Sequence, residues 1–410
     1  MIPETSRATR PLPGWVVALG PLVLLAALVT LIVRTAPADR LRPQGAPPVE
    51  RLAIERATLG SDGIHLSVLN DGPDPVTIAQ VTVDDAFWAF SADGGGTTLR
   101  HLGRTSISIP YPWVPGEAHL VKLLTSTGTT FEHEIAVAVS APKAEAANLG
   151  LFTIIGLYVG VIPVALGLFW YPLVSRLGRT GLDALLALTV GLLAFLFVDA
   201  VKEGLEAAAG MPSSYQGVAL LVAAGAGAYL LLETFGAWLR ARRKRTTPAG
   251  DSGAVLALLV AVGIGLHNFG EGLAIGAAFA LGEAALGTLL ILGFTLHNTT
   301  EGLAIVAPIA KARPSLPTLA SLGLIGGVPT IAGAWCGGLV YSPVLAVACL
   351  GLGAGAIAQV IGQIGGQIGN QIADRTSRGD SGLSRMASAP VALGLVAGFG
   401  VMYITGMLVG

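Results

Sequence analysis

Long apolar segments dominate the chain from residue 149 onward, with short connections between them. A helix needs about 20 consecutive apolar residues to cross the hydrocarbon core of a bilayer, and these segments have about that length or more. The pattern therefore predicts eight membrane-spanning helices. They are 149–172, 181–201, 216–238, 253–282, 284–310, 315–340, 343–372 and 388–410.

A separate apolar run, residues 15–33, lies near the N-terminus and follows Arg7 and Arg10. Two interpretations fit residues 1–38. The run is either a signal anchor that stays in the chain or a signal peptide cut after Ala38, where small residues stand at the spacing of a cleavage site. Its length favours the anchor. With either interpretation, we expect the next segment to be exported.

Residues 39–147 follow a different pattern, in which apolar and polar residues alternate over short stretches such as 63–69, 76–83 and 105–109. Turn sequences rich in Asp, Asn and Gly separate these stretches. About seven short strands in a segment of this length are typical of a small antiparallel β-sandwich. The sequence therefore predicts an extracytoplasmic β-sandwich domain whose ligand is undefined.

A nine-residue sequence occurs twice within the apolar segments. His-Asn-Phe-Gly-Glu-Gly-Leu-Ala-Ile at 267–275 recurs as His-Asn-Thr-Thr-Glu-Gly-Leu-Ala-Ile at 297–305. Residues four apart lie on one face of a helix, so each His stands beside the Glu of its own copy. A carboxylate at the bilayer centre costs at least about 2.5 kcal/mol, and a bound cation or a paired partner would offset that cost.

Consecutive spans with so short a connection must be antiparallel, so the two copies run in opposite directions. This arrangement brings Glu271 near the level of His297, and His267 near the level of Glu301. Two imidazoles and two carboxylates can then converge on one divalent metal ion. The alternative is that these residues only make hydrogen bonds between packed helices.

The two His-Asn-x-x-Glu-Gly segments on consecutive spans resemble the metal-binding helices four and five of the ZIP (Zrt/Irt-like) divalent-metal transporters. The resemblance is specific in these segments, extends more weakly over 149–410, and does not cover residues 1–148. It implies an eight-helix carrier in residues 148–410 that imports divalent transition metals by an elevator-like motion. We expect the site on spans 253–282 and 284–310.

The sequence departs from the family pattern at three positions. Gly270 and Thr300 stand where many ZIP helices have a proline before the Glu, and Val328 stands where helix six often supplies a Glu. Proline kinks in these two helices therefore cannot be assumed. With Val328 removing a ligand of a second site, we expect one metal site. Its expected ligands are His267, Glu271, His297 and Glu301, with Asn268 and Asn298 as auxiliary oxygen donors.

Four other polar residues at membrane depth are candidates for an ion pathway. Asp199 and Glu203 form another pair four residues apart, near the outer end of the second span, where they could attract cations. Glu233 lies near the basic end of the third span, where an exit role or a pairing with the basic run is open. Gln363 belongs to a stripe of amides on the seventh span that either lines a polar path or bonds to a neighbouring helix. The stripe comprises Gln359, Gln363 and Gln367, at four-residue spacing on one face, followed by Asn370 and Gln371.

Composition and charge narrow the class of protein. The chain is 53% apolar and 12% charged, which is typical of a polytopic membrane protein. A net charge near −1 argues against nucleic acid as a partner, and two cysteines within apolar spans indicate no disulfide framework.

Basic residues follow the first, third, fifth and seventh spans, so the positive-inside rule places these connections in the cytoplasm. The basic loop 240–250 is then inside, whereas the β domain and the C-terminus are outside. We therefore expect a multi-pass protein of the cytoplasmic membrane. The basic residues that follow these spans are Arg176, Arg179, Arg240, Arg242, Arg243, Lys244, Arg245, Lys311, Arg313, Arg375, Arg378 and Arg385.

Together these features predict a carrier of divalent transition metals, with zinc first and iron or manganese as other candidates, and with no cofactor. We do not expect an enzyme. An intramembrane zinc-dependent hydrolase that uses the same His/Glu residues, and a membrane metal sensor, are the alternatives. The expected partners are the metal ion and the lipid bilayer, and a homodimer is left open.

Overall fold

The structure is a computed structural model that describes residues 14–35, 47–93, 96–140, 142, 145–246, 252–340, 342–376 and 389–407. The chain divides into two compact units, Met1–Val49 and Glu50–Gly410. The first unit contains helix α1 (Gly14–Thr35), whose apolar side chains from Leu22 to Ile32 are exposed. The predicted cleavage point after Ala38 lies outside the described residues.

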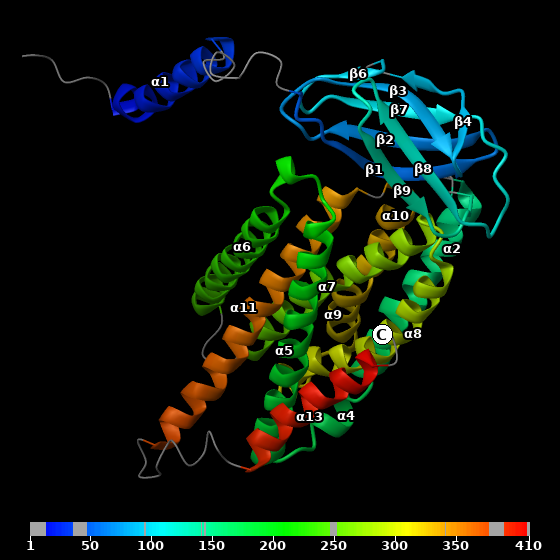
Figure 1. Cartoon of the computed structure of the whole chain (residues 1–410). Coiled ribbons are helices and arrows are strands. Elements are labelled where there is room, and N and C mark those ends of the chain that lie inside the picture. The colour runs from blue at the N-terminus through cyan, green and yellow to red at the C-terminus, as the bar shows by residue number, and fades with distance from the viewer. Residues whose placement is uncertain are drawn as a thin grey trace, which may run out of the picture. The chain divides into compact units, whose positions relative to one another are not determined.

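The second unit begins with a β domain of two packed antiparallel sheets (Figure 1). One sheet has the strand order β1-β2-β7-β5, and the other has the order β4-β3-β8-β9 with β6 paired to β3. The strands are β1 (Leu52–Gly60), β2 (Gly63–Asn70), β3 (Val76–Val83), β4 (Ala86–Trp88), β5 (Ser91–Asp93), β6 (Thr98–Leu99), β7 (Arg104–Ile109), β8 (His119–Thr125) and β9 (Thr130–Ile135). The predicted sandwich is confirmed.

Alternation along the strands explains the core of this domain. Ile64, Leu66 and Val68 are fully buried on one face of β2, and Val121 and Leu123 are fully buried on β8 of the other sheet. Side chains two apart along a strand lie on the same face, so each sheet presents one apolar face to the other. The described residues contain nine strands instead of about seven, because alternation does not reliably reveal strands of two or three residues such as β4, β5 and β6.

Eight helical segments in the described part of the second unit are long and apolar enough to cross a membrane. This confirms the predicted number of spans, and the chain is a multi-pass membrane protein by helix length and hydropathy. The spanning elements are α2 (Ala146–Gly156) with η2 (Leu157–Val161), α3 (Ile162–Leu168) and α4 (Tyr171–Val174), then α5 (Arg179–Ala209), η3 (Ser213–Tyr215) with α6 (Gly217–Thr246), α7 (Ser252–Ala280), α8 (Ala284–Val306) with η4 (Ala307–Ile309), α9 (Leu316–Gly327) with α10 (Pro329–Val340), α11 (Pro343–Thr376) and α13 (Ala389–Gly406).

Helix α7 is central in the bundle and packs against α8, α9, α10 and α11 (Figure 1). Glycines let the backbones of α7 and α10 come into direct contact. Neither Gly272 on α7 nor Gly333 on α10 has room for a Cβ against the backbone of the other helix. The pair Gly167 on α3 and Gly302 on α8 has the same property. Small residues at helix interfaces are the usual means of close packing in a bilayer. They hold α7 and α8 in place beside α10 and α3.

The β domain contacts the connection between α5 and α6. The Asp71 carboxylate accepts hydrogen bonds from the backbone N–H and hydroxyl of Ser213, at 2.8 Å each, and from the N–H of Ser214 at 2.9 Å. The Tyr215 hydroxyl donates to Glu55 Oε1 at 2.7 Å. The end of α5 that carries Ala209 is therefore the end of the bundle nearest to the β domain.

A network of polar groups surrounds Asp84 within the β domain. Its carboxylate accepts hydrogen bonds from the Leu120 N–H, the Tyr111 hydroxyl and Nδ1 of the buried His119, at 2.8 to 2.9 Å. Burial alone would raise the pKa of Asp84, but the hydrogen bond from Leu120, followed by those from His119 and Tyr111, outweighs it. The pKa therefore lies below its usual value of 3.8.

A lowered pKa in the folded state makes the ionised Asp84 a stabilising group above pH 3.8. That stabilisation is lost as the pH falls through the lowered folded-state value. We expect the contribution of Asp84 to the stability of the β domain to stay constant from pH 7 to about pH 5 and to decline below about pH 4. Near-UV circular dichroism during urea titrations at each pH measures this loss.

The variant Asp84→Asn provides the control, since Asn also tolerates the positive φ of 52° at this position. We expect it to lower the free energy of unfolding at pH 7 by about 1 kcal/mol, a small value because the side chain is 41% exposed. The variant should also show a weaker acid dependence than the wild type. Equal acid dependence in both proteins would contradict a stabilising role for the Asp84 carboxylate.

Candidate metal centre

The two copies of the repeated motif lie on α7 and α8, which are neighbours in the bundle. Only residues 281–283 connect the two helices, and Gly282 turns the chain there with a φ of 83°. Both helices continue through Gly270 and Thr300. The His, Asn and Glu side chains of both motif copies are buried.

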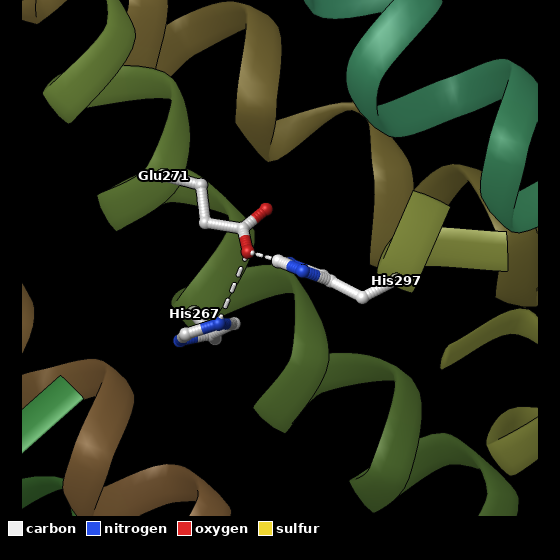
Figure 2. A group of neighbouring side chains, drawn as sticks. All are labelled: His267, Glu271 and His297. Atoms are coloured by element: carbon white, nitrogen blue, oxygen red, sulfur yellow. Dashed lines mark hydrogen bonds and ion pairs between the residues drawn. The ribbon is translucent and has the colours of Figure 1, made fainter. Parts of the chain in front are cut away.

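Three side chains of the motif meet at one point (Figure 2). His267, Glu271 and His297 each offer a ligand atom, and these atoms all lie within 4.8 Å of one another. Glu271 Oε1 is the common contact: it lies 3.2 Å from His267 Nε2 and is also hydrogen-bonded to His297 Nε2. His267 Nε2 and Glu271 Oε1 are close enough for an ion pair, but they are not aligned as a hydrogen bond. His267 Nε2 therefore stays available to a ligand.

Burying the charged Glu271 carboxylate in this cluster costs free energy unless a further group compensates its charge. The three residues are 5 to 7% exposed, within a bundle whose surroundings are largely apolar. A carboxylate in such surroundings needs charge compensation or several hydrogen bonds. Imidazole nitrogen together with carboxylate oxygen is a donor set that suits zinc and other divalent transition metals. The residues therefore fit a metal ion.

Glu301 is the fourth expected ligand, and it does not belong to the group of three. It is 2% exposed, and within the described part of the chain neither of its carboxylate oxygens has a hydrogen-bond partner. Of the four residues expected to converge, three therefore form the group. The fourth, Glu301, is a motif carboxylate outside the group with two unused acceptor oxygens. Unpartnered acceptors of this kind are unusual in a protein interior.

The two motif asparagines use their amide nitrogens rather than their oxygens. Asn268 Nδ2 donates to the Gly326 carbonyl at 3.0 Å, and Asn298 Nδ2 donates to the Val159 carbonyl at 2.9 Å and to Glu271 Oε2 at 3.0 Å. Both Oδ1 atoms are buried and have no partner among the described residues. Both oxygens are therefore free to accept, and their role as auxiliary oxygen donors stays a prediction from the sequence.

A cavity of about 740 Å³ reaches the cluster from between α5, α8 and α13. His297 lines its wall together with Asp199, Glu203 and Glu206 of α5. The two expected pathway carboxylates are thus placed on the same cavity as a member of the cluster. Glu206 and Met402 also line it and were not singled out from the sequence. Glu206 could have been found, since it lies three residues after Glu203 and so on the same face of the helix.

The other two pathway candidates lie elsewhere, in a polar contact between α6 and α11. Glu233 Oε2 accepts hydrogen bonds from Gln359 Nε2 at 3.0 Å and from Gln363 Nε2 at 2.7 Å. Arg240 lies 3.3 Å from Glu233 Oε1 and donates to Gln363 Oε1 at 3.0 Å. Of the two interpretations of the amide stripe, the structure shows bonding to a neighbouring helix for Gln359 and Gln363. Asn370 and Gln371, further along the stripe, have side chains outside the described residues.

Comparison of the sequence with models of known protein families and with curated proteins gives no match. The described residues contain eight helices apolar and long enough to span a membrane, a two-sheet β domain and a buried His-Glu-His group that could bind a metal.

Proposed function

We propose that this protein is a membrane carrier of divalent transition-metal ions, similar to the ZIP transporters. The observation that carries the proposal is the cluster of His267, Glu271 and His297, which is buried on two neighbouring apolar helices and adjoins a cavity. A structural contact between helices would not need a cavity beside it. A carrier needs both a site inside the membrane and a route to that site.

The donor set supports zinc as the first candidate substrate. Two imidazoles and one carboxylate, with Glu301 and the Asn oxygens close in sequence, offer the four nitrogen and oxygen ligands that zinc prefers. Iron and manganese accept the same donor types, and intrinsic affinity alone does not separate these ions. In a carrier the ion must also leave, and a site with only three residues in mutual contact allows exchange of the remaining ligands.

The acidic side chains of α5 that line the cavity are consistent with cation entry from the α5 side of the bundle. Asp199, Glu203 and Glu206 lie in the last third of α5, the end near the β domain. The positive-inside rule, applied to the sequence, assigns that end to the outside. Import into the cytoplasm through the cavity is the direction that we propose. The basic loop 240–250 would face inside, although most of its side chains lie outside the described residues.

A second candidate is an intramembrane zinc-dependent hydrolase, and one observation favours it. Two histidines and one glutamate are also the zinc ligands of some hydrolases, which leave a fourth position for water. Glu301, with both oxygens unpartnered, could then act as the general base. The cavity with three carboxylates favours the carrier, because these groups attract cations, whereas a hydrolase would need a route for its substrate.

Uptake of radiolabelled zinc into vesicles that contain the purified full chain tests the proposal, with iron and manganese ions as competitors. We expect saturable uptake by the wild type and at least about a 100-fold reduction in His297→Ala, because His297 is one of three residues in the cluster. His133→Ala in the β domain is the matched control and should transport normally. Stoichiometric zinc binding without flux would contradict the carrier and favour the hydrolase.

A further inference from the structure

The first membrane span contains a backbone carbonyl that lacks its usual helical donor. A residue in an α-helix accepts a hydrogen bond from the N–H four positions later, and for Val159 that position is Pro163, which has no N–H. The span widens there into the π-helical turn η2, which ends two residues before Pro163. The Val159 carbonyl therefore lacks its α-helical donor and can accept from a donor outside its own helix.

Asn298 on α8 supplies that donor. Its Nδ2 donates to the Val159 carbonyl at 2.9 Å and to Glu271 Oε2 at 3.0 Å, so both amide hydrogens are used. Asn298 is fully buried. One side chain thus joins the irregular turn of the first span to the carboxylate that both cluster histidines contact.

The orientation of Glu271 follows from these contacts. Its Oε2 is held by Asn298, and its Oε1 is the atom that faces His267 and His297. A carboxylate with one oxygen fixed in this way keeps the other directed at the metal position. Partners that orient a metal ligand in this way typically change metal affinity by 10- to 100-fold when removed.

The first copy of the motif, on α7, repeats part of the arrangement. Asn268 Nδ2 donates to the Gly326 carbonyl of α9, immediately before the span breaks and restarts with α10 at Pro329. The two irregular spans also touch, since Gly160 of η2 has no room for a Cβ against Gly327 and Thr330. Each motif asparagine therefore bonds a carbonyl beside a proline-associated irregularity of a neighbouring span.

We propose that Asn298 is a positioning residue for the metal site, and that Pro163 makes this role available by leaving the Val159 carbonyl free. The inference rests on the proposed function, because it assigns a way in which the carrier's cation site is held in shape. It goes beyond that function because it makes Pro163 part of the site, although the first span contributes no metal ligand. If Asn298 served only helix packing, its effect on metal binding would not depend on Pro163.

A double-mutant cycle on the purified full chain tests this dependence, with Co²⁺ as the probe because its visible absorption reports the coordination geometry. Asn298→Ala should weaken Co²⁺ binding by about 10- to 100-fold. Pro163→Ala restores an N–H that competes for the Val159 carbonyl, and should weaken binding in the same direction with an altered spectrum. The double variant should bind no more weakly than Asn298→Ala, since both changes break one connection.

Controls and outcomes separate this inference from the proposed function. Pro172→Ala, at the first turn of α4, should leave Co²⁺ binding unchanged. If Pro163→Ala does not fold, Pro163→Gly restores the same N–H and replaces it in the cycle. Multiplicative losses in the double variant, or wild-type binding by Pro163→Ala, overturn the inference alone. Failure of the wild type to bind Co²⁺ or Zn²⁺ overturns both the inference and the carrier.

Discussion

Glu271→Gln is expected to reduce zinc affinity by at least about 100-fold, or roughly 2.8 kcal/mol, and to abolish uptake. Glu271 Oε1 is the one atom that contacts both His267 and His297, and Gln in its place removes the negative charge while keeping the size. No other carboxylate belongs to the group that the described residues form. Isothermal titration with Zn²⁺ on the purified chain measures the affinity, and vesicle uptake measures the flux.

Two other carboxylates make this prediction specific. Glu301→Gln should have a smaller effect on affinity, of about tenfold, because Glu301 is outside the group of three. Glu233→Gln should leave zinc affinity unchanged, since Glu233 bonds to Gln359 and Gln363 away from the cluster. A Glu271→Gln protein with wild-type affinity would show that the cluster is not the binding site. A reversed ranking of Glu271 and Glu301 would place the ion on the other carboxylate.

The second large effect is expected at the cavity. The double variant Asp199→Asn/Glu203→Gln should raise the KM for zinc uptake by about tenfold with little change in kcat, because it replaces two acidic side chains on the wall that leads to His297. Charges that line a cleft raise the local concentration of a counter-ion by about 10- to 1,000-fold, and salt screens the effect. Initial uptake rates as a function of zinc concentration, at low and at high ionic strength, measure it.

Lys202 offers a control of opposite sign on the same cavity. It lies 3.8 Å from Glu206, and Lys202→Gln removes a positive charge from the wall. We therefore expect a lower KM for this variant, and a difference from wild type that disappears at high salt. If neutralising the carboxylates lowered kcat at constant KM, the residues would serve the transport step and not the entry of the ion.

The arrangement of the ligands shows where sequence reasoning succeeds and where it stops. The four-residue spacing of His267 and Glu271 and the antiparallel course of two consecutive spans follow from helix geometry, and they bring Glu271 level with His297. Which of the four candidates come into contact depends on how far each helix is rotated about its axis. That rotation is set by close contacts such as those of Gly272 and Gly302, and it leaves Glu301 outside the group.

The amide stripe on α11 is a second example of what local spacing predicts and what only helix packing decides. Its four-residue spacing indicated one polar face, but it could not tell whether that face met a path or another helix. The partner is Glu233, 126 residues before Gln359 in the sequence, and only packing of α6 against α11 brings them together. The cavity is a similar case, since α5, α8 and α13 enclose it and no local pattern in any one of them reveals the others.

By itself, the sequence determined the eight spans, the two-sheet β domain and the repeated His-Asn-x-x-Glu motif, because hydropathy, alternation and helical spacing are properties of short stretches of chain. Only the tertiary structure decided that His267, Glu271 and His297 meet, that a cavity with carboxylates reaches them, and that Asn298 bonds to Val159. These contacts join residues up to 139 positions apart. Their distances depend on helix packing, which the sequence encodes only through all of its contacts together.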